Sequence, residues 1–154
     1  MKPSKILIVD DEVPIVEPLK YHLEREGYEV SVAHDGREAL VKCQRKDGYW
    51  NVSLHDSKNY GGKEVTGTSL FIYGMAWGVN NGFLPKERFE PIINKAWNAI
   101  MKDCIHDNGF LGYVQGTGKE PKDGQPVKYD SMPDFEDYGI GCFLLAGVEV
   151  YKMQ

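Results

Sequence analysis

Two adjacent carboxylates, Asp10 and Asp11, are the first residues along the sequence that could take part in chemistry. They directly follow the apolar run from Ile6 to Val9. This run is continuous rather than alternating, which predicts a parallel strand covered on both faces. Carboxylates at the carboxyl end of such a strand lie in the crevice where open α/β sheets bind ligands. Because Mg²⁺ prefers hard oxygen ligands, the pair predicts a weak magnesium site.

A further carboxyl group, that of Glu64, stands just before the run Thr66-Gly67-Thr68. Threonine is a favoured residue at the start of a helix, where its hydroxyl accepts a hydrogen bond from a backbone N–H group. We therefore expect Thr66 or Thr68 to cap a helix here. We expect Glu64 to serve capping and packing rather than acid catalysis.

The elements that must position these groups differ between the two parts of the chain. The first part predicts the order strand, helix, strand, helix, with Gly27 at the end of the first helix. The expected ranges are a strand at 6–9, a helix that carries Val13, Val16, Leu19 and Leu23, a strand at 28–32 and a helix at 37–44.

After Gln44 the sequence becomes rich in glycine and aromatic residues, and runs typical of strands nearly vanish. Apolar residues at helical spacing predict a helix at 66–79, a second from Pro85 or Pro91 to about 104, and a third at about 138–151. Residues 116–137 form a long polar loop. On this pattern Trp77 and Trp97 are expected to lie in the core.

Composition excludes several classes of protein. The 154 residues carry 18 basic and 23 acidic side chains, a net charge of -5, and neither part is basic. We therefore expect no nucleic-acid partner. The four-residue apolar run near the start is too short for a signal peptide or a membrane span, so we expect a cytoplasmic protein without a membrane partner. The three cysteines lack CxxC spacing, which argues against a disulfide framework or a zinc site.

The first 40 residues resemble the receiver domains of response regulators. The resemblance rests on Lys5-Ile-Leu-Ile-Val-Asp10-Asp11-Glu12, on Gly27-Tyr-Glu-Val and on Ala33-His-Asp-Gly-Arg-Glu-Ala-Leu40. It implies that Asp10 and Asp11 match the acidic pair that binds Mg²⁺ for aspartyl phosphorylation. However, no apolar strand ending in Asp follows Leu40, so we expect no complete phosphorelay site and a vestigial acidic pair.

The remainder, from about Leu40 to Met153, resembles the C-terminal part of the unsaturated glucuronyl and rhamnogalacturonyl hydrolases of glycoside hydrolase families 88 and 105. The matching pieces include Gln44-Arg-Lys-Asp-Gly-Tyr-Trp50, Glu64-Val-Thr-Gly-Thr-Ser69, Tyr73-Gly-Met-Ala-Trp-Gly78 and Asp137-Tyr-Gly-Ile-Gly-Cys-Phe-Leu-Leu-Ala146. The resemblance implies a six-hairpin α/α barrel. It also implies a reaction in which an Asp protonates the double bond of an unsaturated uronic acid.

No Asp of this chain matches the position of that catalytic acid, so we expect no catalytic residue and at most the binding of a uronic-acid oligosaccharide. The resemblance implies one wall of a sugar cleft. There Tyr49 and Trp50 would stack on a ring, His55 would hydrogen-bond to it, and Ser131 and Tyr138 would border the cleft. For Trp50 core packing is an alternative, and for His55 an ordinary surface position.

The expected fold class is thus an α/β unit, half of a flavodoxin-like fold, joined to an all-α segment of an α/α barrel. We place the domain boundary between 1–43 and 44–154, within a helix that suits both contexts. Three functions stay open: a carbohydrate-binding relative of the hydrolases, a receiver-like signalling module, and a chimera without evolved activity. The unpaired strand edges and apolar helix faces also allow a homodimer.

Overall fold

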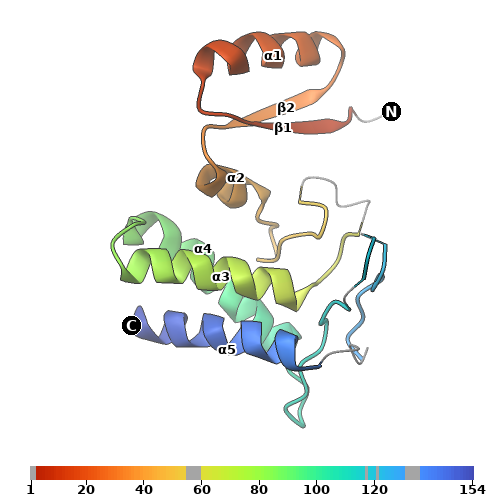
Figure 1. The fold of residues 1–154 in the computed structure, drawn as a ribbon, viewed down its shortest axis with the longest axis vertical. Coiled ribbons are helices and arrows are strands. Elements are labelled where there is room, and N and C mark those ends of the chain that lie inside the picture. Colours follow the sequence, from red (N-terminus) through yellow and green to blue (C-terminus); the bar gives the residue numbers. More distant parts are fainter. Residues whose placement is uncertain (1–2, 55–59, 117, 121, 131–135) are drawn as a thin grey trace.

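The structure is a computed structural model that describes residues 3–54, 60–116, 118–120, 122–130 and 136–154. Its N-terminal part is a βαβα unit built on two parallel strands (Figure 1). The strands pair in register from Lys5 opposite Glu29 to Val9 opposite Ala33. The elements are β1 (Lys5–Val9), α1 (Val13–Arg25), β2 (Glu29–Ala33) and α2 (Gly36–Cys43).

Local signals explain where these helices begin and end. Pro14 lies in the first turn of α1, where no hydrogen bond from its nitrogen is required, and Gly27 follows the helix with a φ of +87°. Asp35 caps α2 by accepting a hydrogen bond from Glu38 N at 2.7 Å, and the Glu38 carboxylate accepts one from His34 N at 2.8 Å. All four elements of this unit were predicted from the sequence.

The expectation that β1 is buried on both faces is wrong. Ile8 is buried, whereas Val9 is 47% exposed. The sheet has the order β1-β2, so within the described residues no third strand covers the outer side of β1. A strand is buried on both faces only where helices cover both faces of the sheet, and the exposed side chain of Val9 shows that one face of β1 is partly open.

The remaining described chain is helical. α3 (Val65–Asn80) lies along α5 (Glu136–Lys152), and α4 (Lys86–Asp103) packs behind α3 (Figure 1). The three helices occur where the sequence predicts them. Their buried faces form the hydrophobic core together with the segment around Trp50. The core residues are Tyr49, Trp50, Val65, Ile72, Met75, Ala76, Phe89, Ile93, Ala96, Ile100, Cys104, Leu111, Val114, Ala146, Val150 and Met153.

Two tryptophans expected in the core have different surroundings. Trp97 is half-buried and stacks on Phe143 at 5.1 Å between ring centroids. Trp77 is 44% exposed and stacks on Phe83, so its prediction as a core residue is wrong. Helical periodicity places Trp77 on a stripe of α3, but that stripe faces outward in this arrangement.

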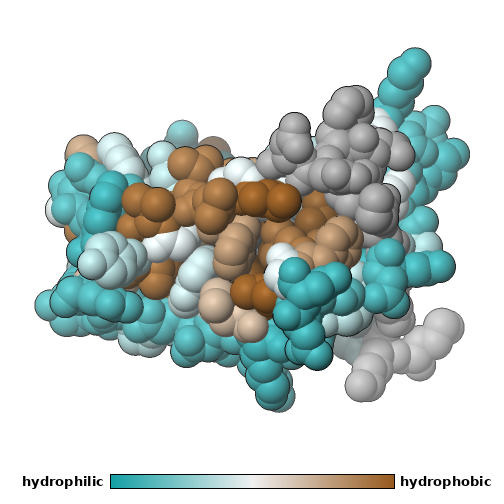
Figure 2. All heavy atoms as spheres, turned by 90° about the horizontal axis from the view of Figure 1, so that it is seen from below, coloured by the Kyte–Doolittle hydropathy of each residue, from teal (hydrophilic) through white to brown (hydrophobic). Residues whose placement is uncertain are grey.

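α5 presents a second apolar face to the outside. The face of the molecule on which α5 lies carries a broad apolar stretch (Figure 2). Its exposed apolar residues on α5 are Ile140, Leu144, Leu145, Val148 and Tyr151. Within the described residues, no helix is both long and apolar enough to cross a membrane.

The helix α2 joins the two parts. On one side, the Lys42 ammonium group donates a hydrogen bond to the backbone carbonyl of Val32 in β2. On the other side, Val41 and Cys43 pack against the helical core. The fold is therefore a mixed α/β arrangement in which a small sheet and a helical part share one connecting helix.

Candidate functional site

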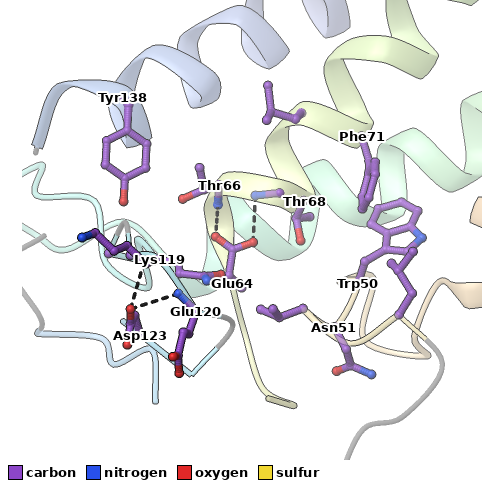
Figure 3. Close-up of a pocket in the computed structure, with 17 residues that line it drawn as sticks. Trp50, Asn51, Glu64, Thr66, Thr68, Phe71, Lys119, Glu120, Asp123 and Tyr138 are labelled. Carbon is purple, nitrogen blue, oxygen red and sulfur yellow. Dashed lines mark hydrogen bonds between the residues drawn. The ribbon is translucent and has the colours of Figure 1, made fainter. Parts of the chain in front are cut away.

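A hollow of about 690 Å³ opens at the N-terminal end of α3 (Figure 3). It lies between the start of α3, the segment after Trp50, the loop that carries Lys119, and the start of α5. Pockets of this volume are typical of sites for small molecules. Its lining residues are Trp50, Asn51, Val52, Leu54, Glu64, Thr66, Gly67, Thr68, Leu70, Phe71, Gln115, Gly116, Gly118, Lys119, Glu120, Asp123 and Tyr138.

Glu64 lines the hollow and caps α3. Its two carboxylate oxygens accept hydrogen bonds from Thr66 N at 2.5 Å and Gly67 N at 2.7 Å. The residue is only 6% exposed. Burial raises the pKa of this carboxyl above its usual value, although the hydrogen bonds from Thr66 and Gly67 oppose the rise. The capping role predicted for Glu64 is confirmed, whereas the prediction that Thr66 or Thr68 is the N-cap is wrong.

Thr68 contributes a buried hydroxyl group to the same hollow. It is 1% exposed, and among the residues that the structure describes its Oγ1 has no hydrogen-bond partner. A buried hydroxyl without a partner loses its hydrogen bonds to water without compensation. Thr68 therefore places a buried hydroxyl without a protein partner in the lining of the hollow.

The loop on the opposite side supplies charge. Asp123 Oδ2 accepts hydrogen bonds from Lys119 N at 2.9 Å and Glu120 N at 3.1 Å, which hold the loop in a turn. The Glu120 carboxylate pairs with Lys122 at 2.7 Å. The ammonium group of Lys119 has no ion-pair partner among the described residues. Lys119 is thus the cation of this lining that is left to pair with an anionic ligand.

Aromatic side chains form the apolar end of the hollow. The ring of Trp50 meets Phe71 edge-on, with centroids 5.3 Å apart. Tyr138 extends from α5 toward the loop that carries Lys119 (Figure 3). The hollow therefore combines an apolar end with a polar end that carries a cation, a carboxyl group and a hydroxyl group.

The family profile described as "Glycosyl Hydrolase Family 88" matches residues 20–154. The chain belongs to glycosyl hydrolase family 88. This confirms the resemblance to the unsaturated uronyl hydrolases. The match also includes the C-terminal part of α1 from residue 20 and all of β2, and so begins earlier than the resemblance read from the sequence.

Two curated relatives of this family 88 chain are named as the same enzyme. An "Unsaturated 3S-rhamnoglycuronyl hydrolase" from Formosa agariphila is 39% identical over 120 residues, which are 78% of this chain and 30% of the relative. A protein of the same name from an Alteromonas species is 42% identical over 113 residues, 73% of this chain and 26% of the relative. The chain thus spans less than a third of the length of either relative.

Solved structures agree with this assignment. A "Glycosyl hydrolase family 88" protein from Bacteroides vulgatus superposes with a TM-score of 0.65 and 40% identity, over 73% of this chain and 32% of that protein. A "possible member of GH105 family" from Salmonella enterica gives a TM-score of 0.58 at 28% identity, over 74% of this chain and 29% of that protein. The helical part of the fold is therefore that of a segment of these hydrolases.

A short segment of the family 88 chain has different relatives. The transcriptional regulatory protein PhoP of Bacillus subtilis is 60% identical over 41 residues, 27% of this chain and 17% of the relative. TrcR of Mycobacterium tuberculosis is 48% identical over 43 residues, 28% of this chain and 17% of the relative. The resemblance to response regulators is confirmed over about a quarter of the chain.

The structure places the predicted sugar-binding residues in different surroundings. Tyr138 and Trp50 line the hollow, but Trp50 is 1% exposed, so its ring is not free to stack on a sugar. Tyr49 is 0% exposed, and its hydroxyl donates a hydrogen bond to Ala99 O at 2.9 Å. The structure therefore makes Tyr49 a core residue, because no face of its ring is open for stacking. His55 and Ser131 lie outside the described residues.

Asp10 and Asp11 lie at the end of β1, remote in the fold from the hollow at α3 (Figure 1). Asp10 Oδ1 accepts a hydrogen bond from Glu12 N at 2.8 Å, which leaves its second oxygen available. Within the described residues no group of three or more His, Cys, Asp or Glu side chains could hold a metal ion. The magnesium site at Asp10 and Asp11 therefore stays a prediction from the sequence.

Sequence reasoning missed Thr68 and Lys119 as residues of the hollow. Thr68 was interpreted as a helix cap, and Lys119 as part of a solvated loop. The available signal was the pattern Glu-x-Thr-Gly-Thr at a helix start, since such a start is also a place where ligands bind. Nothing in the sequence showed that the loop with Lys119 folds back to this helix.

Proposed function

We propose that the hollow at the start of α3 binds the uronic-acid unit of an oligosaccharide, without turning it over. The observation that carries this proposal is the joint presence of Lys119, Gln115 and the buried Thr68 hydroxyl around one cavity. A uronic acid offers a carboxylate for an ammonium group and hydroxyl groups for polar partners. The names of the two curated relatives, both rhamnoglycuronyl hydrolases, support the same class of ligand.

We propose no turnover because hydrogen bonds to the backbone occupy the Glu64 carboxylate. General acid catalysis requires a carboxyl group whose proton can reach the reacting atom. Glu64 has the raised pKa that suits an acid, but its two oxygens are occupied by Thr66 N and Gly67 N. Asp123 is likewise bonded to its own loop. These groups hold the wall of the site in shape.

The test uses an unsaturated uronyl disaccharide added to the purified protein. Calorimetric titration measures binding, and the absorbance of the substrate double bond measures turnover. We expect saturable binding and a constant absorbance. A loss of absorbance that Glu64→Gln abolishes would overturn the assignment of Glu64 as a purely structural residue, and a titration without heat or spectral change would overturn binding.

Two matched pairs of variants locate the ligand. Lys119→Gln should weaken binding about tenfold or more through the lost ion pair, whereas Lys122→Gln, outside the lining, should leave it unchanged. Thr68→Val removes the buried hydroxyl at constant shape and should weaken binding. Ser69→Ala removes a buried hydroxyl that does not line the hollow and serves as its control.

A second candidate function is the binding of Mg²⁺ by Asp10 and Asp11 in a receiver-like unit at 1–43, derived from half of a flavodoxin-like fold. The 60% identity to a response regulator over 41 residues and the parallel β1-α1-β2 unit favour it. In a titration with Mg²⁺ followed by NMR, the amide resonances of Asp10 and Asp11 alone should shift. Treatment with a small phosphodonor should add no mass to the intact protein, since we propose no phosphoacceptor.

A further inference from the structure

The outer edge of β1 is an unpaired hydrogen-bonding surface. Toward β2, Ser4 O accepts a hydrogen bond from Glu29 N, and Asp10 N donates one to Ala33 O. The direction of backbone groups alternates along a strand. The N–H and C=O groups of Lys5, Leu7 and Val9 therefore point away from β2, where the described residues provide no strand to receive them.

The side chains at this edge favour pairing with another strand. The sequence of β1 is Lys-Ile-Leu-Ile-Val, which is rich in β-branched residues, and Val9 is 47% exposed. Protein edges are usually protected by proline, inward-facing charges or a bulge. From Lys5 to Val9 the edge has one charged residue, at its first position, and no proline.

We propose that the outer edge of β1 pairs in antiparallel fashion with β1 of a second copy of this chain, about a two-fold axis at Leu7. The result is a four-stranded sheet with β1 of both copies at its centre. In this register Leu7 faces Leu7 of the second copy, and Lys5 faces Val9. All three outward-facing residues of each copy are thereby paired, and the contact is symmetric.

Other registers of the same edge use fewer of these groups. A shift that places Lys5 opposite Leu7 would set Val9 against Pro3, which has no N–H group to donate. A shift that places Leu7 opposite Val9 would extend the pairing to Asp11, beyond the end of the strand. The register centred on Leu7 is therefore the one that uses the strand fully.

Charge complementarity favours a second copy over an unrelated strand. In the proposed register Lys5 lies opposite Val9 of the other copy, and Asp11 of that copy is its diagonal neighbour, two residues past the end of β1. A diagonal neighbour is within reach of a lysine side chain. Lys5 is exposed, with only a surface ion pair to Glu29 at 3.0 Å, and Asp11 is also exposed. The symmetry gives two such contacts in each dimer.

The first test measures mass and amide protection on the unaltered full chain. Light scattering should show a shift with concentration from 17.4 kDa toward twice this mass. In the dimer the amide hydrogens of Lys5, Leu7 and Val9 should become protected from exchange. Ile6 and Ile8, whose amides face β2, should be protected at every concentration. A monomer at all concentrations, or a dimer with rapidly exchanging Leu7 and Val9 amides, would overturn the proposal.

Paired variants test the edge itself. Leu7→Pro removes an outward N–H group and leaves the hydrogen bonds between β1 and β2 in place, so the dissociation constant should rise at least about tenfold. Val30→Pro does the same at the outer edge of β2 and should leave the dimer intact. Circular dichroism checks that both variants fold.

A third variant separates the edge from the apolar face of α5. Leu144, 57% exposed, lies on that face. Leu144→Lys should leave the dimer unchanged if β1 forms the contact. Loss of the dimer in Leu144→Lys, with Leu7→Pro still dimeric, would assign the contact to the helix face and overturn the proposal. The proposal would also be overturned if the purified chain formed no dimer and a different protein were recovered bound to it.

Discussion

The indole nitrogen of Trp50 donates a hydrogen bond to the backbone carbonyl of Leu40 at 2.8 Å. Leu40 lies in α2, in the segment that resembles response regulators, whereas Trp50 belongs to the core of the helical part. Gln44 strengthens the same junction, because its Nε2 donates to Ile92 O at 3.0 Å in α4. The connecting helix is therefore fixed to the helical core by specific polar contacts.

We predict that Trp50→Phe lowers the free energy of unfolding by about 1–3 kcal/mol. The change removes the hydrogen bond to Leu40 and leaves a small cavity in the core. Trp77→Phe is the control, since Trp77 is 44% exposed and Phe preserves contact with Phe83; it should change stability by no more than about 0.5 kcal/mol. Urea unfolding measures both. Equal effects of the two substitutions would contradict the junction described above.

Asn80 and Glu149 join the ends of α3 and α5. Asn80 Nδ2 donates to Glu149 O at 2.9 Å and to Glu149 Oε2 at 2.8 Å, and Glu149 is 5% exposed. Asn80→Ala should cost about 1–3 kcal/mol, because it leaves a buried carboxylate with fewer partners. Asn81→Ala, at an exposed neighbour, should cost about 0.5 kcal/mol. Thermal or urea unfolding measures both variants. If both had the stability of the parent, the hydrogen bonds between Asn80 and Glu149 would not stabilise the contact of α3 with α5.

The same carboxyl group makes stability depend on acid. Hydrogen bonds from Lys152 and Asn80 hold the pKa of Glu149 below its usual value of 4.5. A depressed pKa stabilises the folded state above the unfolded value, and this contribution is lost as the pH falls through the folded pKa. Below about pH 4.5 the parent should therefore lose stability more steeply than Asn80→Ala. If the stability of the parent and of Asn80→Ala fell equally with pH over this range, the prediction would be wrong.

Glu64 should act in the opposite sense and in a different pH range. Burial raises the pKa of this carboxyl above 4.5, so the folded protein binds the proton more tightly than the unfolded chain. As the pH falls from neutral through the folded pKa toward 4.5, the free energy of unfolding should rise. Glu64→Gln should lack this rise. Carbon NMR titration of Glu64 measures the pKa directly, and a midpoint below 4.5 would disprove the prediction.

Cys104 should be the slowest of the three thiols to react. It is 0% exposed, and burial raises the pKa of its thiol to about 11. Cys43 and Cys142 are half-buried, and burial raises the pKa of each as well. At pH 8 a disulfide reagent should titrate two thiols in the folded protein and a third only after denaturation. Cys104→Ala, the control, should give two thiols in both states.

The sequence alone determined the helices and strands and the two family resemblances of the chain. The apolar run of β1, the periodic faces of α3, α4 and α5, and the glycines that follow helices are local signals. Each depends on residues a few positions apart, so each can be interpreted without the fold. The motifs around Asp10, Trp50 and Tyr138 identified both families for the same reason.

Only the tertiary structure decided which faces are buried and what surrounds the hollow. Trp77 and Trp97 both lie on helical stripes, yet one is exposed, because burial depends on which helices pack together. Likewise Tyr49 and Trp50 are neighbours in sequence, but only Trp50 borders the hollow. Lys119 reaches the hollow through a loop more than 50 residues from Glu64 in sequence. Such long-range contacts arise from packing and leave no periodic trace in the sequence.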